Sequence, residues 1–163
     1  MTKKRLLLDT NVLLDMVVPN RAGHSAAVNL VSDALSAGFT LLYPARVLGD
    51  VFYIASSDAK RLLVRDGLQV TDEMAHVCNA YAWDAIDKIC AIATAVGEDE
   101  SDVWMARKLR AINKDLEDCF VMAAARRAEA DYLVTSDKGL HKHASVATVS
   151  TTDLLQLIHE GVA

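Results

Sequence analysis

Residues 6–9 read Leu-Leu-Leu-Asp, a short apolar run that ends in an acid. A continuous apolar run of this length is typical of a central strand in a parallel sheet, because helices cover such a strand on both faces. Residues 132–137 read Tyr-Leu-Val-Thr-Ser-Asp and again place an acid just after an apolar strand. The sequence therefore predicts two buried strands that each lead to a carboxylate.

The rest of the chain alternates predicted strands with predicted helices. Further strands are expected at residues 39–43 and 146–149, and helices at 25–37, 45–56, 71–88, 102–111, 116–129 and 152–159. Residues 89–96 fit either a continued helix or a short strand, and we favour the strand. This alternation over one domain, residues 1–163, predicts an α/β fold: a three-layer α/β/α sandwich around a central, mainly parallel sheet.

The composition is that of a globular protein. Hydrophobic residues make up 52% and charged residues 24% of the 163 residues. No apolar run approaches the roughly 20 residues of a membrane helix, and the apolar stretch after the basic N-terminus is too short for a secretion signal. The sequence thus predicts a cytoplasmic protein without membrane contact. The net charge of −5 is unusual for a nucleic-acid binder, but cations bound to clustered acids would offset it locally.

The cysteines and tryptophans carry predictions about the core. Cys78, Cys90 and Cys119 lie in helix-like, alanine-rich surroundings without a CxxC or Cys-His spacing. We interpret them as reduced, buried residues rather than metal ligands. Trp83 and Trp104 are predicted to be core or interface aromatics rather than platforms on which bases stack.

Two acids follow strands. Asp9 comes directly after the first apolar run, and Asp137 comes shortly after the run at residues 132–135. Ligands of open parallel sheets bind beyond the carboxyl ends of the strands, so both acids are expected at that edge. The alternative for Asp9 is a helix cap, and the alternative for Asp137 is a turn residue before Lys138-Gly139.

Two further acids lie on apolar faces of predicted helices. Asp50 falls among apolar residues of the 45–56 helix, and Asp118 shares a face with apolar residues of the 116–129 helix. A carboxylate in an apolar stripe is either paired with a cation or ligates a metal. Arg46 and Arg126 are the candidate partners if the role is structural.

If the four acids converge, electrostatics requires a cation. Two like charges about 4 Å apart repel by roughly 4 kcal/mol at an effective dielectric near 20. A ligand set of carboxylates without His or Cys favours Mg²⁺ or Mn²⁺ over zinc. Such a site activates water and stabilises the charge of an in-line phosphodiester displacement, which is nuclease chemistry.

Four stretches resemble motifs of the PIN-domain family: residues 9–15, 43–54, 116–125 and 131–137. The resemblance extends from Leu6 to Leu157. It implies an α/β/α sandwich, Mg²⁺- or Mn²⁺-dependent endoribonuclease activity on RNA, and often a toxin role beside an antitoxin, as in VapC-type pairs. Carried over by position, Asp9, Asp50, Asp118 and Asp137 would be the catalytic, metal-binding acids.

The resemblance also implies supporting roles. Thr10 or Asn11 together with Thr135 would donate hydrogen bonds that orient the carboxylates, and Asp115 would be an outer acid. The family's second acid is often Glu, and the shorter Asp50 departs from that pattern. Residues 58–110 match little beyond a helical pattern, so we expect them to set substrate choice. The family resemblance makes a homodimer plausible.

Other classes of protein share parts of this pattern. A haloacid-dehalogenase-type phosphatase needs a second Asp two residues after the first, where this chain has Asn11. A receiver domain needs a phospho-accepting Asp at the end of a mid-chain strand, where this chain has Pro44. The alternative that stays open is a PIN fold kept as a binding or scaffold module with little catalysis. Cleavage of mixed RNA that EDTA abolishes would separate the enzyme from the scaffold.

Overall fold

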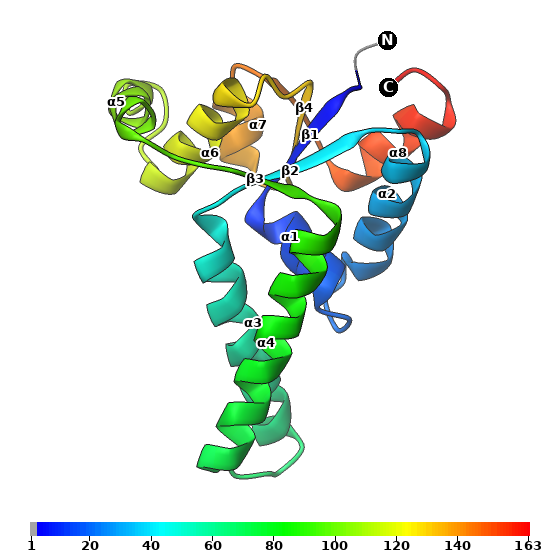
Figure 1. Ribbon diagram of the computed structural model, residues 1–163, viewed down its shortest axis with the longest axis vertical. Helices are drawn as coiled ribbons and strands as arrows, with labels where there is room; N and C mark the ends of the chain where they lie inside the picture. The colour runs from blue at the N-terminus through cyan, green and yellow to red at the C-terminus, as the bar shows by residue number, and fades with distance from the viewer. Residues whose placement is uncertain (1–2) are drawn as a thin grey trace.

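A parallel sheet of five strands lies at the centre of the computed structural model, which describes residues 3–163. The strands are β1 (Arg5–Leu8), β2 (Thr40–Pro44), β3 (Thr94–Val96), β4 (Tyr132–Val134) and β5 (Ala147–Val149), in the order β3-β2-β1-β4-β5 (Figure 1). All four pairings are parallel. The predicted parallel sheet is confirmed, with β1 at its centre.

Helices cover both faces of the sheet because successive side chains of a strand point to opposite sides. Leu6 and Leu8 pack with α1 (Thr10–Val17), α2 (His24–Ser36), α3 (Val47–Arg65), α4 (Asp72–Ile92) and α8 (Thr151–His159). Leu7 packs on the other face with α5 (Glu100–Leu109), α6 (Leu116–Arg127) and α7 (Lys138–His143). The predicted three-layer α/β/α sandwich is therefore confirmed. Within residues 3–163, no helix combines the length and the apolar character needed to cross a membrane.

Helices α3 and α4 form a long hairpin that projects away from the sheet (Figure 1). Phe52 and Trp83 pack edge to face across it, with ring centroids 5.3 Å apart. Thr71 begins α4 as its N-cap, where its hydroxyl accepts a hydrogen bond from the backbone N–H of Met74 at 3.3 Å. The first turn of α3 stays next to the sheet, so only the distal part of the hairpin leaves the body of the protein.

The favoured strand at residues 89–96 is wrong over its first half. Residues 89–92 continue α4, and only Thr94–Val96 form a strand. Ile86 and Ile89 are buried on one face of α4, which extends the helical spacing of apolar residues past the expected end at residue 88. Apolar runs of this length do not distinguish a buried strand from a buried helix by pattern alone.

Two predictions about core residues are wrong in part. Cys78 and Cys119 are buried free thiols as expected, but Cys90 is exposed. Trp83 and Trp104 are 61% and 56% exposed, so neither is a core residue, and an interface role for them stays a prediction. Both tryptophans lie on helices whose inner faces are already filled by smaller side chains such as Ala82 and Ala106.

Candidate functional site

Asp9 lies at the carboxyl edge of the sheet, between the two central strands. The pairing of β1 with β4 aligns Leu8 with Val134, so the residues that follow, Asp9 and Thr135, become neighbours. The Thr135 hydroxyl donates to Asp9 Oδ2 at 2.6 Å, and the backbone N–H of Thr10 donates to Oδ1 at 2.8 Å. Both oxygens of the carboxylate are thereby oriented by the fold.

Burial gives the Asp9 carboxylate an unusual environment. The residue is only 6% exposed. Burial raises the pKa of Asp9, while the hydrogen bonds from Thr135 and Thr10 act in the opposite direction and the nearby charge of Asp137 adds to the rise. Asp9 is also the N-cap of α1. The capping role and the position at the strand edge thus occur together, and the sequence had left them as alternatives.

Asp118 lies in the first turn of α6, and residues of the preceding loop hold its carboxylate. Asp115 is the N-cap of this helix and accepts hydrogen bonds from the backbone N–H groups of Glu117 and Asp118. Asn113, which is buried, donates through Nδ2 to Asp118 Oδ2 at 2.8 Å. Burial raises the pKa of Asp118, and the charges of Asp137, Asp115 and Asp9 raise it further against the hydrogen bond from Asn113. Asp118 therefore lies in the electrostatic field of the other acids.

Asp137 is the N-cap of α7. Its Oδ1 accepts hydrogen bonds from the backbone N–H groups of Gly139 and Leu140, at 2.6 and 3.1 Å. Its own N–H donates to the Thr135 hydroxyl at 3.0 Å, so one hydroxyl links Asp137 to Asp9. This confirms the geometry expected of Thr135. The helix-capping role also replaces the isolated turn that was the alternative for Asp137.

Gly139 allows the carboxylates of Asp118 and Asp137 to approach one another. A Cβ atom at this position would lie 2.9 Å from Asp137 Oδ1 and 3.2 Å from Asp118 Oδ2. Both oxygens therefore lie close to Gly139, where a Cβ would push against them. The backbone conformation of Gly139 is one that other residues adopt, so glycine is favoured here for the space it leaves to the carboxylates.

Asp50 lies in the first turn of α3 and shares a hydrogen bond with Glu117 of α6. That hydrogen bond is the main reason why the pKa of Glu117 rises to about 7, followed by burial and the charge of Asp50, while Arg46 acts against the rise. The carboxyl groups of Asp50 and Glu117 are therefore neighbours in the cleft. Glu117 was not among the predicted site residues.

The same sequence test that selected Asp118 would have selected Glu117. Phe120, Val121 and Ala124 lie three, four and seven residues after Glu117, which is the apolar spacing of a common helical face. Adjacent acids on a helix point in different directions, about 100° apart. Here both directions reach the same cleft, because Asp118 faces the sheet edge and Glu117 faces α3.

All four predicted acids line one cleft of about 450 Å³ at the carboxyl edge of the sheet. Its lining residues are Asp9, Thr10, Asn11, Asp50, Tyr53, Ile54, Asp115, Glu117, Asp118, Val121 and Asp137. Within residues 3–163, no three His, Cys, Asp or Glu side chains stand ready as a ligand set for one ion. The carboxylates therefore share a cleft without closing into a metal-binding cage.

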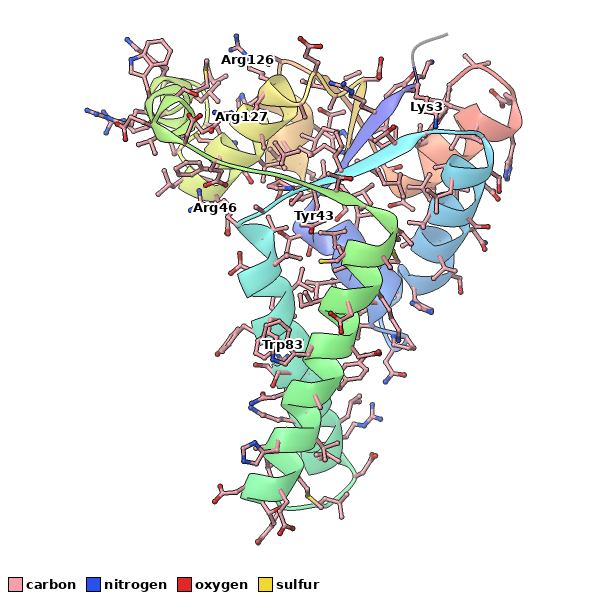
Figure 2. All side chains as sticks on the ribbon, in the orientation of Figure 1. Lys3, Tyr43, Arg46, Trp83, Arg126 and Arg127 are labelled. Carbon is pink, nitrogen blue, oxygen red and sulfur yellow. The ribbon has the colours of Figure 1, made fainter. Side chains whose placement is uncertain are left out.

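The proposed ion-pair partners lie elsewhere. Arg46 is 3.7 Å from a carboxylate oxygen of Glu98, and its guanidinium stacks 3.7 Å from the centroid of the Phe120 ring, where α3 begins near α6 (Figure 2). Arg126 contacts the sulfur of Met105. In the part of the chain that the structure describes, neither arginine forms an ion pair with Asp50 or Asp118. The alternative that Asp50 and Asp118 serve only as ion-pair partners of these two arginines is therefore not supported.

The support expected from Thr10 or Asn11 takes another form. No hydrogen bond joins their side chains to Asp9 within the described residues, and of these two residues only Thr10 donates to Asp9, through its backbone N–H. Residues 138–143 form the short helix α7. His141 Nε2 lies 3.0 Å from the carbonyl oxygen of Thr135, which ties α7 to the end of β4.

Comparison with known proteins identifies the family. The sequence model of the PIN domain matches residues 5–139. Among curated proteins, no sequence matches significantly.

Solved structures with the same fold are only distantly related in sequence. VapBC2 from Rickettsia felis, solved bound to a DNA fragment from the promoter, has a TM-score of 0.64 and 12% identity over 90% of this chain and 98% of that chain. FitAB bound to an IR36 DNA fragment has a TM-score of 0.56 and 17% identity, over 90% and 94% of the two chains. FitAcB from Neisseria gonorrhoeae has a TM-score of 0.55 and 18% identity, over 90% and 98%.

At such low identity these structures support the fold alone. The sequence match is the stronger finding, because it covers most of the chain and includes all four predicted acids. The chain therefore belongs to the PIN domain family, whose members are generally nucleases.

Proposed function

We propose that this chain is an endoribonuclease that hydrolyses RNA phosphodiester bonds and depends on Mg²⁺ or Mn²⁺. The catalytic, metal-binding acids are Asp9, Asp50, Asp118 and Asp137, and we add Glu117 as a catalytic residue that does not bind the ion. The observation that carries the proposal is that these carboxylates line one cleft in a PIN-domain chain.

The chemistry of the cleft fits a hard divalent cation. Its potential ligands are carboxylate oxygens, which Mg²⁺ and Mn²⁺ prefer. Asp118 Oδ1 and Asp137 Oδ2 accept no hydrogen bond from residues 3–163, so each of these carboxylates keeps one oxygen for an ion. The raised pKa values of Asp9 and Asp118 reflect burial and crowded negative charge, and a cation would relieve the crowding.

The residues of the chain orient the reaction. A bound divalent ion would acidify water and neutralise charge on the phosphate. Thr135 fixes the carboxylate of Asp9, Asn113 fixes that of Asp118, and the first turn of α7 fixes that of Asp137. Such fixed donors cost no reorganisation as the reaction proceeds.

Glu117 and Asp50 contribute a different property. The pKa of Glu117, which its neighbour Asp50 raises to about 7, places a group that gives or takes a proton at neutral pH on the α3 side of the cleft. A catalytic acid or base works best when its pKa lies near the working pH. We assign Glu117 the proton transfer that accompanies cleavage, and Asp50 a contact with the ion.

The proposed setting is that of a toxin with an antitoxin partner. We infer that residues 1–163 act as one nuclease domain in the cytoplasm, as a homodimer held in check by an antitoxin protein. The support for the partner is the shared fold with VapBC2, FitAB and FitAcB. The test of the partner is co-purification with the product of a neighbouring gene, followed by recovery of nuclease activity when the two are separated.

The test of the activity uses the whole protein and a mixed pool of single-stranded RNA. We expect internal cleavage with Mn²⁺ or Mg²⁺ and no cleavage in EDTA, with activity restored when the ion is returned. RNA binding without cleavage under every ion condition would contradict the proposal and support the scaffold alternative. Equal cleavage in EDTA would contradict the metal requirement.

A further inference from the structure

A strongly basic stretch leads into the acidic cleft. Residues 107–114 read Arg-Lys-Leu-Arg-Ala-Ile-Asn-Lys and contain four cations and no acid, in a chain whose net charge is −5. We call this stretch the basic segment. Its four cations, Arg107, Lys108, Arg110 and Lys114, are all exposed. Four like charges within eight residues repel one another, so their concentration favours a negatively charged ligand.

The fold itself makes little use of these charges. Across residues 3–163, no cation of the basic segment forms an ion pair, whereas Arg127 on the adjacent helix binds Asp99 and Asp102 at 2.7 Å. The helix dipole accounts for cations in the last turn of α5, which are Arg107 and Lys108. The amine of Lys114 donates to the carbonyl of Arg110 at 3.1 Å. Arg110 is the C-cap of α5, so the dipole also favours its charge, but no acid among residues 3–163 pairs with its side chain.

The basic segment is physically connected to the cleft. Asn113, within the segment, donates to the carboxylate of Asp118, and its own Oδ1 accepts from the backbone N–H of Asp115 at 2.9 Å. Asp115 and Asp118 both line the cleft. Helix α5 lies beside α6 at the outer edge of this layer (Figure 1). A strand of nucleic acid that leaves the cleft past Asp115 would therefore meet the basic segment next.

An exposed aromatic ring accompanies the cations. Trp104 lies one helical turn before Lys108, whose amine is 5.3 Å from the centroid of the indole ring. Surfaces that bind single-stranded nucleic acid combine cations along the backbone with aromatic rings on which bases stack. The end of α5 offers both kinds of contact on one exposed surface.

We propose that the basic segment binds the phosphates of the RNA strand next to the bond that is cut, with Trp104 as a stacking platform for a base. This inference rests on the proposed ribonuclease function, and it adds the surface that holds the substrate. It also explains how an acidic protein binds a polyanion, because the attraction is concentrated beside the cleft instead of being spread over the chain.

The test compares two triple variants of equal charge. Arg107→Gln/Lys108→Gln/Arg110→Gln removes three of the four charges of the basic segment and leaves Lys114, which contacts the backbone of Arg110, in place. Lys3→Gln/Lys4→Gln/Arg5→Gln removes three charges at the amino end of β1, on the edge of the sheet opposite the cleft. Binding of a fluorescent, mixed-sequence single-stranded RNA is measured by anisotropy in EDTA over a range of NaCl concentrations, and cleavage is measured with Mn²⁺.

We expect the basic-segment variant to flatten the slope of log Kobs against log[NaCl] by about 2, since each phosphate contact to a single strand contributes about 0.7. Its KM should rise at least tenfold with kcat nearly unchanged, because the contacts are the same in the ground state and the transition state. The variant at the amino end of β1 should keep the slope and the KM of the wild type. Trp104→Ala should raise KM without changing the slope.

The outcomes separate this inference from the proposed function. If the wild-type protein neither binds nor cuts RNA, both are wrong. If it cuts RNA and the basic-segment variant retains the wild-type slope and KM, the ribonuclease function stands and the basic segment is not an RNA surface. An acidic partner protein would then be the occupant to test. Equal losses in both triple variants would show a general effect of net charge, which also overturns the inference.

Discussion

On the side of the cleft formed by β1, β4 and α6, each carboxylate is held by uncharged hydrogen-bond donors, whereas on the α3 side Asp50 is held by another acid. Thr135, Asn113 and backbone N–H groups orient Asp9, Asp118 and Asp137. Asp50 instead lies next to Glu117, and this contact is the main reason why the pKa of Glu117 rises to about 7. The first side orients its carboxylates with neutral donors, and the second carries a group whose charge changes near neutral pH.

The substitution Asp118→Asn should have the largest effect. It keeps the hydrogen bond from Asn113 but removes a charge that would hold the cation, and metal ions supply several kcal/mol of transition-state stabilisation. At 1.36 kcal/mol per tenfold change, kcat/KM should fall by about 100-fold or more. The metal-free variant should melt above the wild type at neutral pH, because a carboxylate with a raised pKa destabilises the folded state when it is charged.

The matched control for this substitution is Asp84→Asn, which alters an exposed carboxylate on α4 that does not line the cleft. It should leave activity unchanged. Wild-type cleavage by the Asp118→Asn protein with saturating Mn²⁺ would remove Asp118 from the mechanism and, with it, the functional difference between the two sides of the cleft.

Divalent ions should stabilise the folded protein. A ligand that binds only the folded state adds about 2.7 kcal/mol at 100 times its Kd, which for a chain of this size is several degrees in Tm. Mn²⁺ should act at lower concentration than Mg²⁺. Melting curves in MnCl₂ and in NaCl of equal ionic strength measure the effect. Identical shifts in the two salts would show screening of scattered acids instead of a metal site.

Thr135→Val tests the side held by uncharged donors. The hydroxyl is fully buried and serves both Asp9 and the N–H of Asp137. Its loss should reduce the free energy of unfolding by about 2 kcal/mol, within the range for a buried acceptor left without a donor, and should lower kcat through misorientation of Asp9. Denaturant unfolding and kinetics measure the two effects. Thr148→Val on β5, whose hydroxyl donates to the carbonyl of Val146, is the control and should retain kcat.

Glu117→Gln tests the side of the cleft where Glu117 lies next to Asp50. Of the substitutions considered, it should change the free energy of unfolding least. A folded-state pKa of about 7, above the ordinary value of Glu, means that the folded protein binds the proton more tightly than the unfolded chain. This contribution to stability is complete below about pH 4.5 and is lost as the pH rises through 7. The Tm of the metal-free wild type should therefore fall between about pH 5 and pH 8.

The Gln variant should flatten this fall and shift the pH profile of kcat, whereas Glu129→Gln, in the turn after α6, should change neither. An unchanged Tm profile in Glu117→Gln would show that Asp50 does not raise the pKa of Glu117. The two sides of the cleft would then hold their acids in the same way.

The parts of the fold that follow from local pattern were predictable. Apolar runs that end in acids located β1 and β4, and the acids themselves located the cleft, because parallel strands bring their carboxyl ends to one edge. The arginine partners named for Asp50 and Asp118 were wrong, since contacts between distant elements leave no periodic signal. The apolar spacing of residues 117–124 could have marked Glu117 as a candidate, but its role depends on the approach of α3, which that spacing does not encode.

The ends of the helices were less predictable than their existence. Helix α3 continues to Arg65, beyond the expected end at residue 56, and α4 absorbs residues 89–92. Both helices are stabilised by packing against each other along the hairpin, so their lengths reflect tertiary contact more than local propensity. Helices α1 and α7 are short, and their N-caps are Asp9 and Asp137. Two residues predicted for chemistry thus also serve the local structure.

The hydrogen bond between Thr135 and Asp9 joins residues 126 positions apart in the sequence. Its consequence concerns synthesis. While the chain is being made, β1, α1 and α3 emerge long before β4, so Asp9 and Asp50 are present without the groups that orient Asp9. The cleft is completed only when residues 132–139 leave the ribosome and β4 adds to β1. A nascent or truncated chain that ends before Thr135 therefore carries no assembled site, and the proposed activity would begin only when nearly the whole chain has been translated.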